Sequence, residues 1–118
     1  MANMYIEREM VHQASVQRAR EGILSSIEVG KMCKIFQVLS EPCRLKIVLA
    51  LMKGEMCVYH LAEVCDATVS GVSHQLRIMR DNGIVRAKRF GKNVEYSIAD
   101  SHVYEMVSMA LAHLKCEG

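Results

Sequence analysis

Residues 68–83 read TVSGVSHQLRIMRDNG, and they follow a shorter helical stretch, CVYHLAEVC, at residues 57–65. Thr68 is a favourable N-cap, and Asn82-Gly83 is a typical helix stop. The apolar positions expected to face the core recur at helical spacing: Val69, Val72, Leu76 and Met79. Two helices joined by about three residues make a helix-turn-helix unit, which we place at residues 57–80.

The next stretch, GIVRAKRFGKNVEYSIA at residues 83–99, has the only β-like pattern in the chain. Ile84 and Val85 begin one strand, and the residues from Val94 to Ile98 alternate along a second, with FGKN as the turn. A hairpin directly after a helix-turn-helix is the wing of a winged helix, here at residues 84–99. The predicted fold class is therefore mainly α with a small β-hairpin.

Three more helical segments precede this unit. In VGKMCKIFQVLS (residues 29–40), the apolar residues recur at helical spacing. In SEPCRLKIVLALMKG (residues 40–54), we expect Ser40 as the N-cap, Pro42 in the first turn and Gly54 as the stop. Its apolar residues cover most of the helix surface, so we expect the central buried helix here. Residues 5–28 are helix-prone, with breaks expected near Gly22 and Gly30. We treat residues 1–28 as a helical arm of a single domain spanning residues 1–118.

Composition limits the class of protein. The 118 residues suffice for one domain, and 51% hydrophobic with only 5% aromatic residues indicates an aliphatic, helical core. A net charge of +2 excludes a histone-like binder, so local charge matters more than the total. No stretch approaches the roughly 18 apolar residues of a membrane span. Glu7, Arg8 and Glu9 stand where a signal peptide needs its apolar core, so we expect a cytoplasmic protein with no membrane partner.

The five cysteines are irregularly spaced, and their number is odd: Cys33, Cys43, Cys57, Cys65 and Cys116. In a reducing compartment they are core residues, metal ligands or redox thiols rather than a disulfide framework. The chain has neither a glycine-rich phosphate loop nor a nucleophile-base pairing. We therefore do not expect an enzyme.

Basic residues concentrate in the second half of the predicted unit, with Asp81 as the one acid among them: Arg77, Arg80, Arg86, Lys88, Arg89 and Lys92. Such a patch neutralises phosphates and releases counterions, and polar side chains on the preceding helix reach base edges. The candidate DNA-binding residues are Ser70, Ser73, His74, Gln75, Arg77, Arg80, Lys88, Arg89 and Lys92. The alternative is an ordinary solvated basic face.

Four stretches carry a resemblance to the ArsR/SmtB family of metal-responsive bacterial repressors: VLSEPCRLKIVLAL, GEMCVYHLAE, VSHQLRIMRDNGIV and RFGKNVEYSIAD. The resemblance covers about residues 28–118. It implies a homodimeric winged helix that binds operator double-stranded DNA in the metal-free form and releases it when its inducer binds. Glu41 replaces the family's usual Asp before Pro42, and Cys43 occupies a place usually held by Asn or Thr.

The C-terminal stretch, residues 100–116, is predicted to be a helix with metal-capable side chains at both ends. Asp100 and His102 stand at the start, and His113 and Cys116 at the end. Eleven residues from His102 to His113 give roughly 16 Å and return to nearly the same face. The two half-sites therefore cannot share a metal within one chain. If two such helices pack antiparallel about a two-fold axis, Asp100 and His102 of one chain meet the second half-site of the other chain.

A carboxylate, two imidazoles and a thiolate form a closed tetrahedral set suited to Zn(II). Family members with sensors on this helix carry Asp, His, His and either Glu or His. Cys116 stands at the fourth position, with Glu117 as the alternative ligand. A thiolate shifts preference toward softer ions such as Cd(II). The bland alternative is that Asp100 is only the N-cap and His113 only a C-terminal helix cation. The helix-helix seam is assigned to Val103, Met106, Val107, Ala110, Leu111 and Leu114.

A second candidate metal site combines Cys57 and His60 with His12 of the N-terminal arm. Other family members place a Cys with an Asp or a second Cys here, but Tyr59 interrupts the arsenite-type Cys-x-Cys pattern. The alternative is a packed Cys57 and a surface His60.

Two functions are consistent with these observations. The first is a repressor released from DNA by Zn(II), or by a similar divalent ion such as Cd(II), Co(II) or Pb(II). The second keeps the fold and the DNA binding but responds to oxidation or persulfidation of Cys33, Cys43, Cys65 or Cys116.

Overall fold

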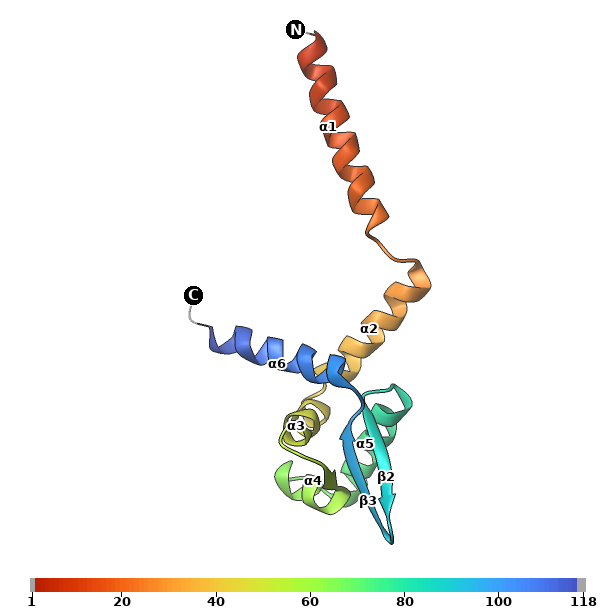
Figure 1. Cartoon of the computed structure of the whole chain (residues 1–118), viewed down its shortest axis with the longest axis vertical. Coiled ribbons are helices and arrows are strands. Elements are labelled where there is room, and N and C mark those ends of the chain that lie inside the picture. The colour runs from red at the N-terminus through yellow and green to blue at the C-terminus, as the bar shows by residue number, and fades with distance from the viewer. Residues whose placement is uncertain (1, 117–118) are drawn as a thin grey trace. The chain divides into compact units, whose positions relative to one another are not determined.

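The computed structural model describes residues 2–116. The chain forms two compact units, one ending at Cys33 and one beginning at Lys34. Figure 1 shows the order of the elements, six helices and three short strands along the described chain. The fold class predicted from the sequence, a mainly α winged helix, is confirmed.

The first unit contains α1 (Ala2–Glu21) and the start of α2 (Ser26–Ser40). The break predicted near Gly22 is confirmed, but the break near Gly30 is wrong, since Gly30 lies inside α2. A capping box starts α2 upstream of this glycine: Glu28 N donates to Ser25 Oγ (3.2 Å), and Ser25 N donates to Glu28 Oε1 (3.4 Å). One interior glycine costs only about 1 kcal/mol, so the capped helix continues through it.

Helix α3 (Pro42–Leu51) is capped by Glu41, not by Ser40 as predicted. The Glu41 carboxylate accepts from Arg44 N at 2.9 Å. Ser40 is the last residue of α2, and its hydroxyl donates back to Gln37 O, so it cannot serve the next helix. The helix ends at Leu51, before Gly54.

The predicted burial of α3 holds on one side only. Ile47, Val48, Ala50 and Leu51 are buried, whereas Leu45 and Leu49 are exposed on a second side of the helix. Figure 1 places α3 beside α4 and α5, which cover the buried side. The apolar surface of α3 is larger than the core of one chain can cover. Its second side therefore stays uncovered within a single chain.

The helix-turn-helix consists of α4 (Val58–Val64) and α5 (Val69–Asp81). Thr68 is the N-cap of α5, as predicted, and its Oγ1 accepts from Gly71 N at 3.0 Å. Val72, Leu76 and Met79 are buried as predicted, but Val69 is 38% exposed. Val69 is the first residue of the helix, where the chain has only just entered from the turn.

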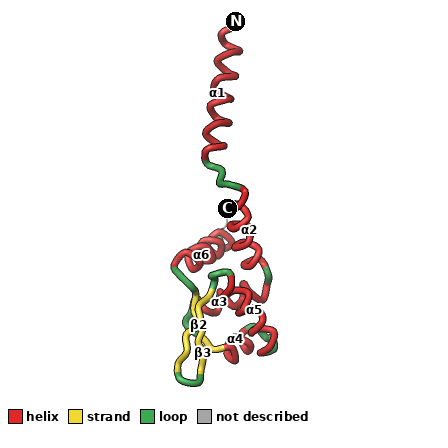
Figure 2. The backbone as a smooth tube through the Cα atoms, turned by 90° about the vertical axis from the view of Figure 1, so that its right-hand side faces the viewer, coloured by secondary structure: helices red, strands yellow, loops and turns green. Residues whose placement is uncertain are grey.

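The wing is the antiparallel hairpin of β2 (Val85–Phe90) and β3 (Asn93–Ile98). Gly91 occupies the two-residue turn with φ 61, a conformation that glycine adopts without strain. A third strand that the sequence did not reveal, β1 (Met56–Cys57), pairs with β3 through Met56 and Tyr96. Two residues are too few to show strand alternation. Figure 2 shows the hairpin lying beside α3, α4 and α5.

Helix α6 (Ser101–Lys115) follows the sheet and joins the core of the second unit through Val103 and Val107. The largest fully buried side chains of this core are Ile47, Leu61, Leu76, Met79, Ile84, Val38, Val48 and Val72. No helix within residues 2–116 combines the length and apolarity needed to cross a bilayer.

Candidate nucleic-acid interface and metal-binding helix

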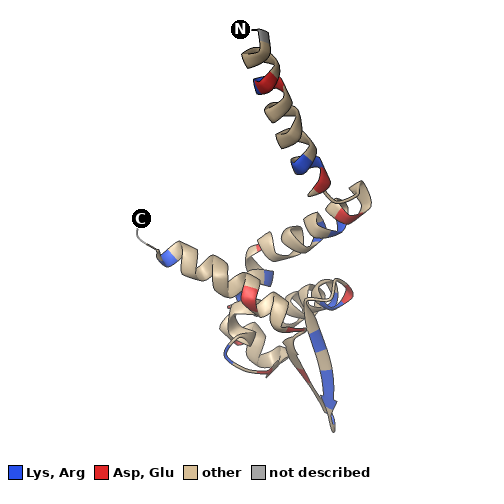
Figure 3. Cartoon of the chain, turned by 45° about the horizontal axis from the view of Figure 1, so that its top comes forward, with Lys and Arg blue, Asp and Glu red and all other residues tan. Residues whose placement is uncertain are grey.

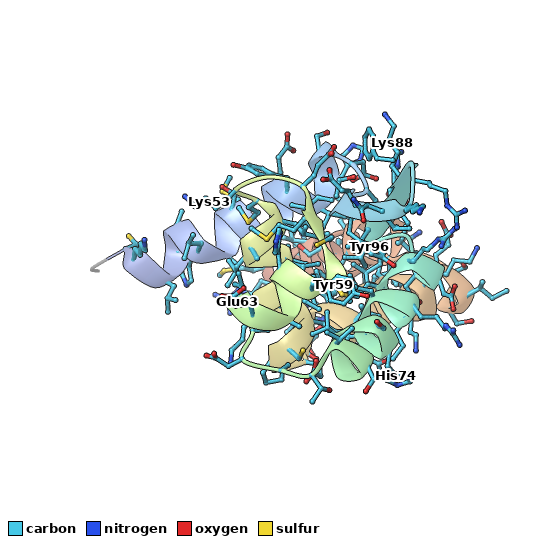
Figure 4. The ribbon with its side chains drawn as sticks, turned by 90° about the horizontal axis from the view of Figure 1, so that it is seen from below. Lys53, Tyr59, Glu63, His74, Lys88 and Tyr96 are labelled. Carbon is cyan, nitrogen blue, oxygen red and sulfur yellow. The ribbon has the colours of Figure 1, made fainter. Side chains whose placement is uncertain are left out.

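Helix α5 presents a polar side opposite its buried residues. Ser70, Ser73, His74 and Arg77 are exposed, and Figure 4 shows His74 pointing away from the molecule. The core contacts of Val72, Leu76 and Met79 hold the helix in place, so these polar groups are displayed on a rigid support. Hydrogen-bonding side chains on such a helix suit the donor and acceptor pattern of the major groove.

Gln75 differs from the other candidates on α5 because it is half-buried and already bonded. Its Oε1 accepts from Arg44 Nη1 at 2.9 Å. Arg44 also donates from Nε to Val38 O at 2.7 Å and from Nη2 to Gln37 O at 3.5 Å. One guanidinium thus joins the last turn of α2, the first turn of α3 and the middle of α5. The sequence reveals no such link, because Arg44 and Gln75 lie 31 residues apart.

The wing adds a line of exposed cations to this surface. Arg86, Lys88 and Arg89 are exposed along β2, and Lys92 is exposed in the turn. Figure 3 shows this basic line along the strand. Lys88 Nζ lies 5.0 Å from the centroid of the Phe90 ring, a cation-π contact that holds the ammonium on the outer face.

A polar hollow joins α5 to the sheet. It is lined by Ser73, Leu76, Arg77, Arg80, Asp81 and Tyr96. Two guanidiniums against the single Asp81 carboxylate leave the hollow net positive, and with its two hydroxyls it suits an anionic group such as a backbone phosphate. Tyr96 was not among the residues singled out from the sequence. The sequence pattern placed it on β3, but only the pairing of β3 with β2, which packs against α5, brings it to the hollow; Figure 4 labels Tyr96.

The first candidate half-site lies at the start of α6. Asp100 is the N-cap, and its Oδ1 accepts from Val103 N at 3.1 Å. The same oxygen lies 3.6 Å from His102 Nδ1, so the two side chains are brought together. The His102 side chain is 84% exposed. The capping role of Asp100 is therefore confirmed, and a carboxylate has further lone pairs for a second partner.

The second candidate half-site lies at the other end of the same helix. His113 and Cys116 are both exposed, and Cys116 N donates to His113 O at 3.1 Å. Glu117, the alternative ligand, lies outside the described residues. Within residues 2–116 no three His, Cys, Asp or Glu side chains gather as a metal-binding group. The two halves stay apart in one chain, as the helix length requires.

The second candidate metal site is not assembled within the second unit. Cys57 is the half-buried N-cap of α4 and makes no capping bond with its side chain. His60 is exposed on α4, one turn later. His12 is exposed on α1 of the first unit. Cys57 and His60 are a pair of donors and not a closed set.

The surface along α6 and α3 is apolar and uncovered. Leu45, Leu49, Val107, Ala110, Leu111 and Leu114 line one groove, and Phe36 and Leu39 of α2 extend it. Leu114 is 79% exposed and Met109 is 73% exposed. Val103, predicted as a seam residue, is instead buried in its own core, whereas Val107 is buried and also lines the groove. The exposed remainder of α6 is thus the part available to a partner.

Comparison of the sequence with known proteins identifies relatives over nearly the whole chain. Residues 41–87 match the family described as bacterial regulatory protein, arsR family. The transcriptional repressor SmtB homolog of Synechocystis sp. is 36% identical over 109 residues, which are 92% of this chain and 83% of that protein. The cadmium resistance transcriptional regulatory protein CadC homolog of Staphylococcus aureus is 33% identical, over 87% of this chain and 85% of that protein.

Solved structures show the same architecture. The AntR antimony-specific transcriptional repressor superposes with a TM-score of 0.71 at 34% identity, over 79% of this chain and 85% of that chain. The homodimeric winged helix-turn-helix domain Mb0332 of Mycobacterium bovis has a TM-score of 0.72 at 22% identity, over 79% and 88% respectively, and supports the fold alone. The relatives are transcriptional regulators that bind DNA, rather than enzymes.

Proposed function

Because this chain belongs to the arsR family of bacterial regulatory proteins, we propose that it is a repressor that binds operator DNA as a metal-free homodimer and releases it when Zn(II) binds. Cd(II) is the second candidate inducer, since a thiolate ligand favours softer ions. The observation that carries the proposal is the pair of exposed half-sites at the two ends of α6.

DNA binding is supported by the combined surface of α5 and the wing. The polar side of α5 meets base edges, and the cations of β2 and of the turn meet the phosphates on either side. The hollow lined by Arg77, Arg80 and Tyr96 receives a phosphate between these two contacts. An exposed basic surface assembled by two elements in this way is more than an ordinary solvated face.

Dimerisation is supported by the apolar groove along α3 and α6. Burying Leu114 against a partner removes a large exposed apolar side chain of this groove from water. Pairing α6 antiparallel with its counterpart places Asp100 and His102 beside His113 and Cys116 of the other chain. Two equivalent sites follow, and each closes only in the dimer.

The donor set fits an ion with four protein ligands in tetrahedral coordination. Asp100 offers a carboxylate, His102 and His113 offer imidazoles, and Cys116 offers a thiolate once it is deprotonated. A bound ion supplies a bond between the two chains at each site. Helix α6 is anchored to the core through Val103 and Val107, and α5 packs against the same core. A metal ion that fixes the position of α6 therefore also affects the position of α5. Metal and DNA then disfavour each other reciprocally.

The proposal is tested by titrating DNA with the metal-free dimer in the presence and absence of Zn(II). A duplex selected from a random library by the metal-free protein serves as the probe. We expect Zn(II) to weaken binding at least about fivefold, the lower range of allosteric coupling. His113→Ala should abolish this response and leave metal-free binding unchanged, whereas the exposed His60→Ala serves as the matched control. Equal affinity with and without metal in the wild type would falsify the proposal.

Co(II) absorption identifies the ligands independently of DNA. Tetrahedral coordination gives intense d–d bands, and thiolate coordination adds a charge-transfer band. We expect both in the wild type and the loss of the charge-transfer band alone in Cys116→Ser. A charge-transfer band that persists in that variant would exclude Cys116 as the fourth ligand.

A further inference from the structure

Arg44, in the first turn of α3, is a half-buried cation whose hydrogen bonds reach two other helices. Its Nη1 donates to Gln75 Oε1 of α5 at 2.9 Å. Its Nε donates to Val38 O at 2.7 Å and its Nη2 to Gln37 O at 3.5 Å, both in the last turn of α2. These three acceptors are neutral oxygens. The guanidinium therefore contributes the fixed directions of its donors at this place, rather than an ion pair.

The bond to Arg44 restricts what Gln75 can offer to DNA. A glutamine reads adenine with both ends of its amide, the oxygen and the nitrogen together. Because arginine has only donors, the Gln75 amide must turn its oxygen toward Arg44. Gln75 is half-buried, whereas its neighbour His74 is exposed. The Gln75 amide, held in this way, does not present both of its groups to a base.

We propose that Arg44 is a positioning residue for DNA recognition, which fixes α5 against α2 through Gln75, and that Gln75 itself does not read a base. The inference rests on the proposed DNA binding by α5 and the wing. Val72, Leu76 and Met79 hold α5 on the core, but apolar contacts are non-directional. A hydrogen bond is directional, and one with a charged donor is stronger than a neutral one. The bond from Arg44 therefore restrains rotation and sliding of α5 on the core.

The helices that Arg44 joins to α5 also line the apolar groove. Leu39 and Ser40 of α2 line it together with Leu45, the residue after Arg44. In the proposed dimer this groove is the seam between the chains, so Arg44 sets the position of each α5 relative to the seam. Two recognition helices must reach half-sites roughly 34 Å apart on the DNA. A shift of α5 against the seam therefore weakens the fit to both half-sites.

The test is a double-mutant cycle on the metal-free full chain, with Arg44→Lys, Gln75→Ala and both changes together. Urea unfolding followed by circular dichroism establishes that each variant is folded, and binding to the selected duplex gives its affinity. We expect each single variant to bind at least about threefold more weakly, as for residues in direct contact. The double variant should bind no more weakly than the weaker single variant, because both changes break the same bond.

Gln75→Glu separates positioning from base reading. A glutamate keeps an oxygen acceptor for Arg44, so this variant should recover the affinity that Gln75→Ala loses. A base-reading glutamine would behave differently, because a glutamate cannot donate to adenine and pairs with cytosine instead. A panel of duplexes carrying every single base-pair substitution measures the preference. We expect both Gln75 variants to keep the wild-type preferred base at every position. Gln37→Ala is the matched control, an exposed glutamine whose main-chain carbonyl remains.

Wild-type DNA affinity in a folded Gln75→Ala variant would overturn the proposal, even if the variant unfolds at lower urea, since the bond would then be merely structural. Additive effects of the two single changes, or a preference altered at one base pair in each half-site, would overturn it too. If Arg44→Lys does not fold, the comparison of Gln75→Ala with Gln75→Glu decides alone. Failure of the proposed function looks different, because the wild-type chain itself would then select no duplex or ignore Zn(II).

Discussion

Glu41 shows how one side chain sets the start of a helix. Its carboxylate accepts from Arg44 N, and this backbone hydrogen bond lowers the pKa of Glu41 from its ordinary value of 4.5. The same turn orients Arg44, whose guanidinium then contacts α2 and α5. A cap that appears local therefore supports the contact between three helices.

We expect Glu41→Ala to lower the free energy of unfolding by about 1 kcal/mol near neutral pH, the usual contribution of an N-cap. The folded-state pKa lies below the unfolded value, so this contribution is fully present above pH 4.5. It is lost as the pH falls through the folded-state pKa. Urea unfolding of wild type and variant at a series of pH values measures the difference. Glu63→Ala, an exposed glutamate on α4, is the control, and a pH-independent difference for Glu41→Ala would contradict the prediction.

In the proposed function, α5 and the wing both contact DNA. Neither element alone indicates a DNA-binding surface, since α5 is a helix with one polar side and β2 is a basic edge strand. The sheet packs beside α5, and the hollow with Arg77, Arg80 and Tyr96 lies where they meet. Phosphate contacts therefore depend on how two elements are placed, and base contacts depend on α5 alone.

Removing one wing cation should reduce the salt dependence of DNA binding. Lys88→Ala loses one phosphate contact, so the slope of log K against log[salt] should become shallower by about 0.9. Sequence preference should be unchanged, because phosphate contacts carry no base information. Lys53→Ala is the matched control, since Lys53 is exposed after α3 and outside the proposed surface (Figure 4). A slope equal to that of the wild type would show that Lys88 makes no phosphate contact.

The uncovered groove along α3 and α6 concerns the whole assembly. The second unit buries a complete core, yet Leu45, Leu49 and Leu114 stay exposed around one groove. In the proposed dimer a second copy of the chain covers this surface, and the same pairing would close the proposed metal sites. Dimerisation and metal sensing share α6 in this proposal.

Leu114→Glu should shift the protein from dimer to monomer, because it places a charge in the apolar seam. Sedimentation equilibrium across a concentration series measures the dissociation constant. Val64→Glu is the control, since Val64 is 54% exposed on α4 and lies outside the groove. We expect Val64→Glu to remain dimeric. A Leu114→Glu variant that dimerises as tightly as the wild type would place the dimer seam elsewhere.

Most helices and the wing hairpin of this protein could be predicted from the local sequence pattern. Helix periodicity, the Thr68 cap and the hairpin of the wing follow from neighbouring residues, and all three are confirmed. The alternation expected along β3 is not, since its residues from Val94 to Ile98 are all half-buried. The separation of His102 from His113 is also a local property, since helix rise alone keeps them apart. Fold class and candidate ligands followed from these signals without knowledge of any long-range contact.

Tertiary packing decided the rest, because the deciding contacts join residues distant in the chain. The hydrogen bond from Arg44 to Gln75 and the pairing of Met56 with Tyr96 leave no periodic pattern in the sequence. Packing also separated Val103, which faces the protomer's own core, from Leu114, which does not. An amphipathic pattern shows that a helix has an apolar side, and only the fold shows which neighbour covers it.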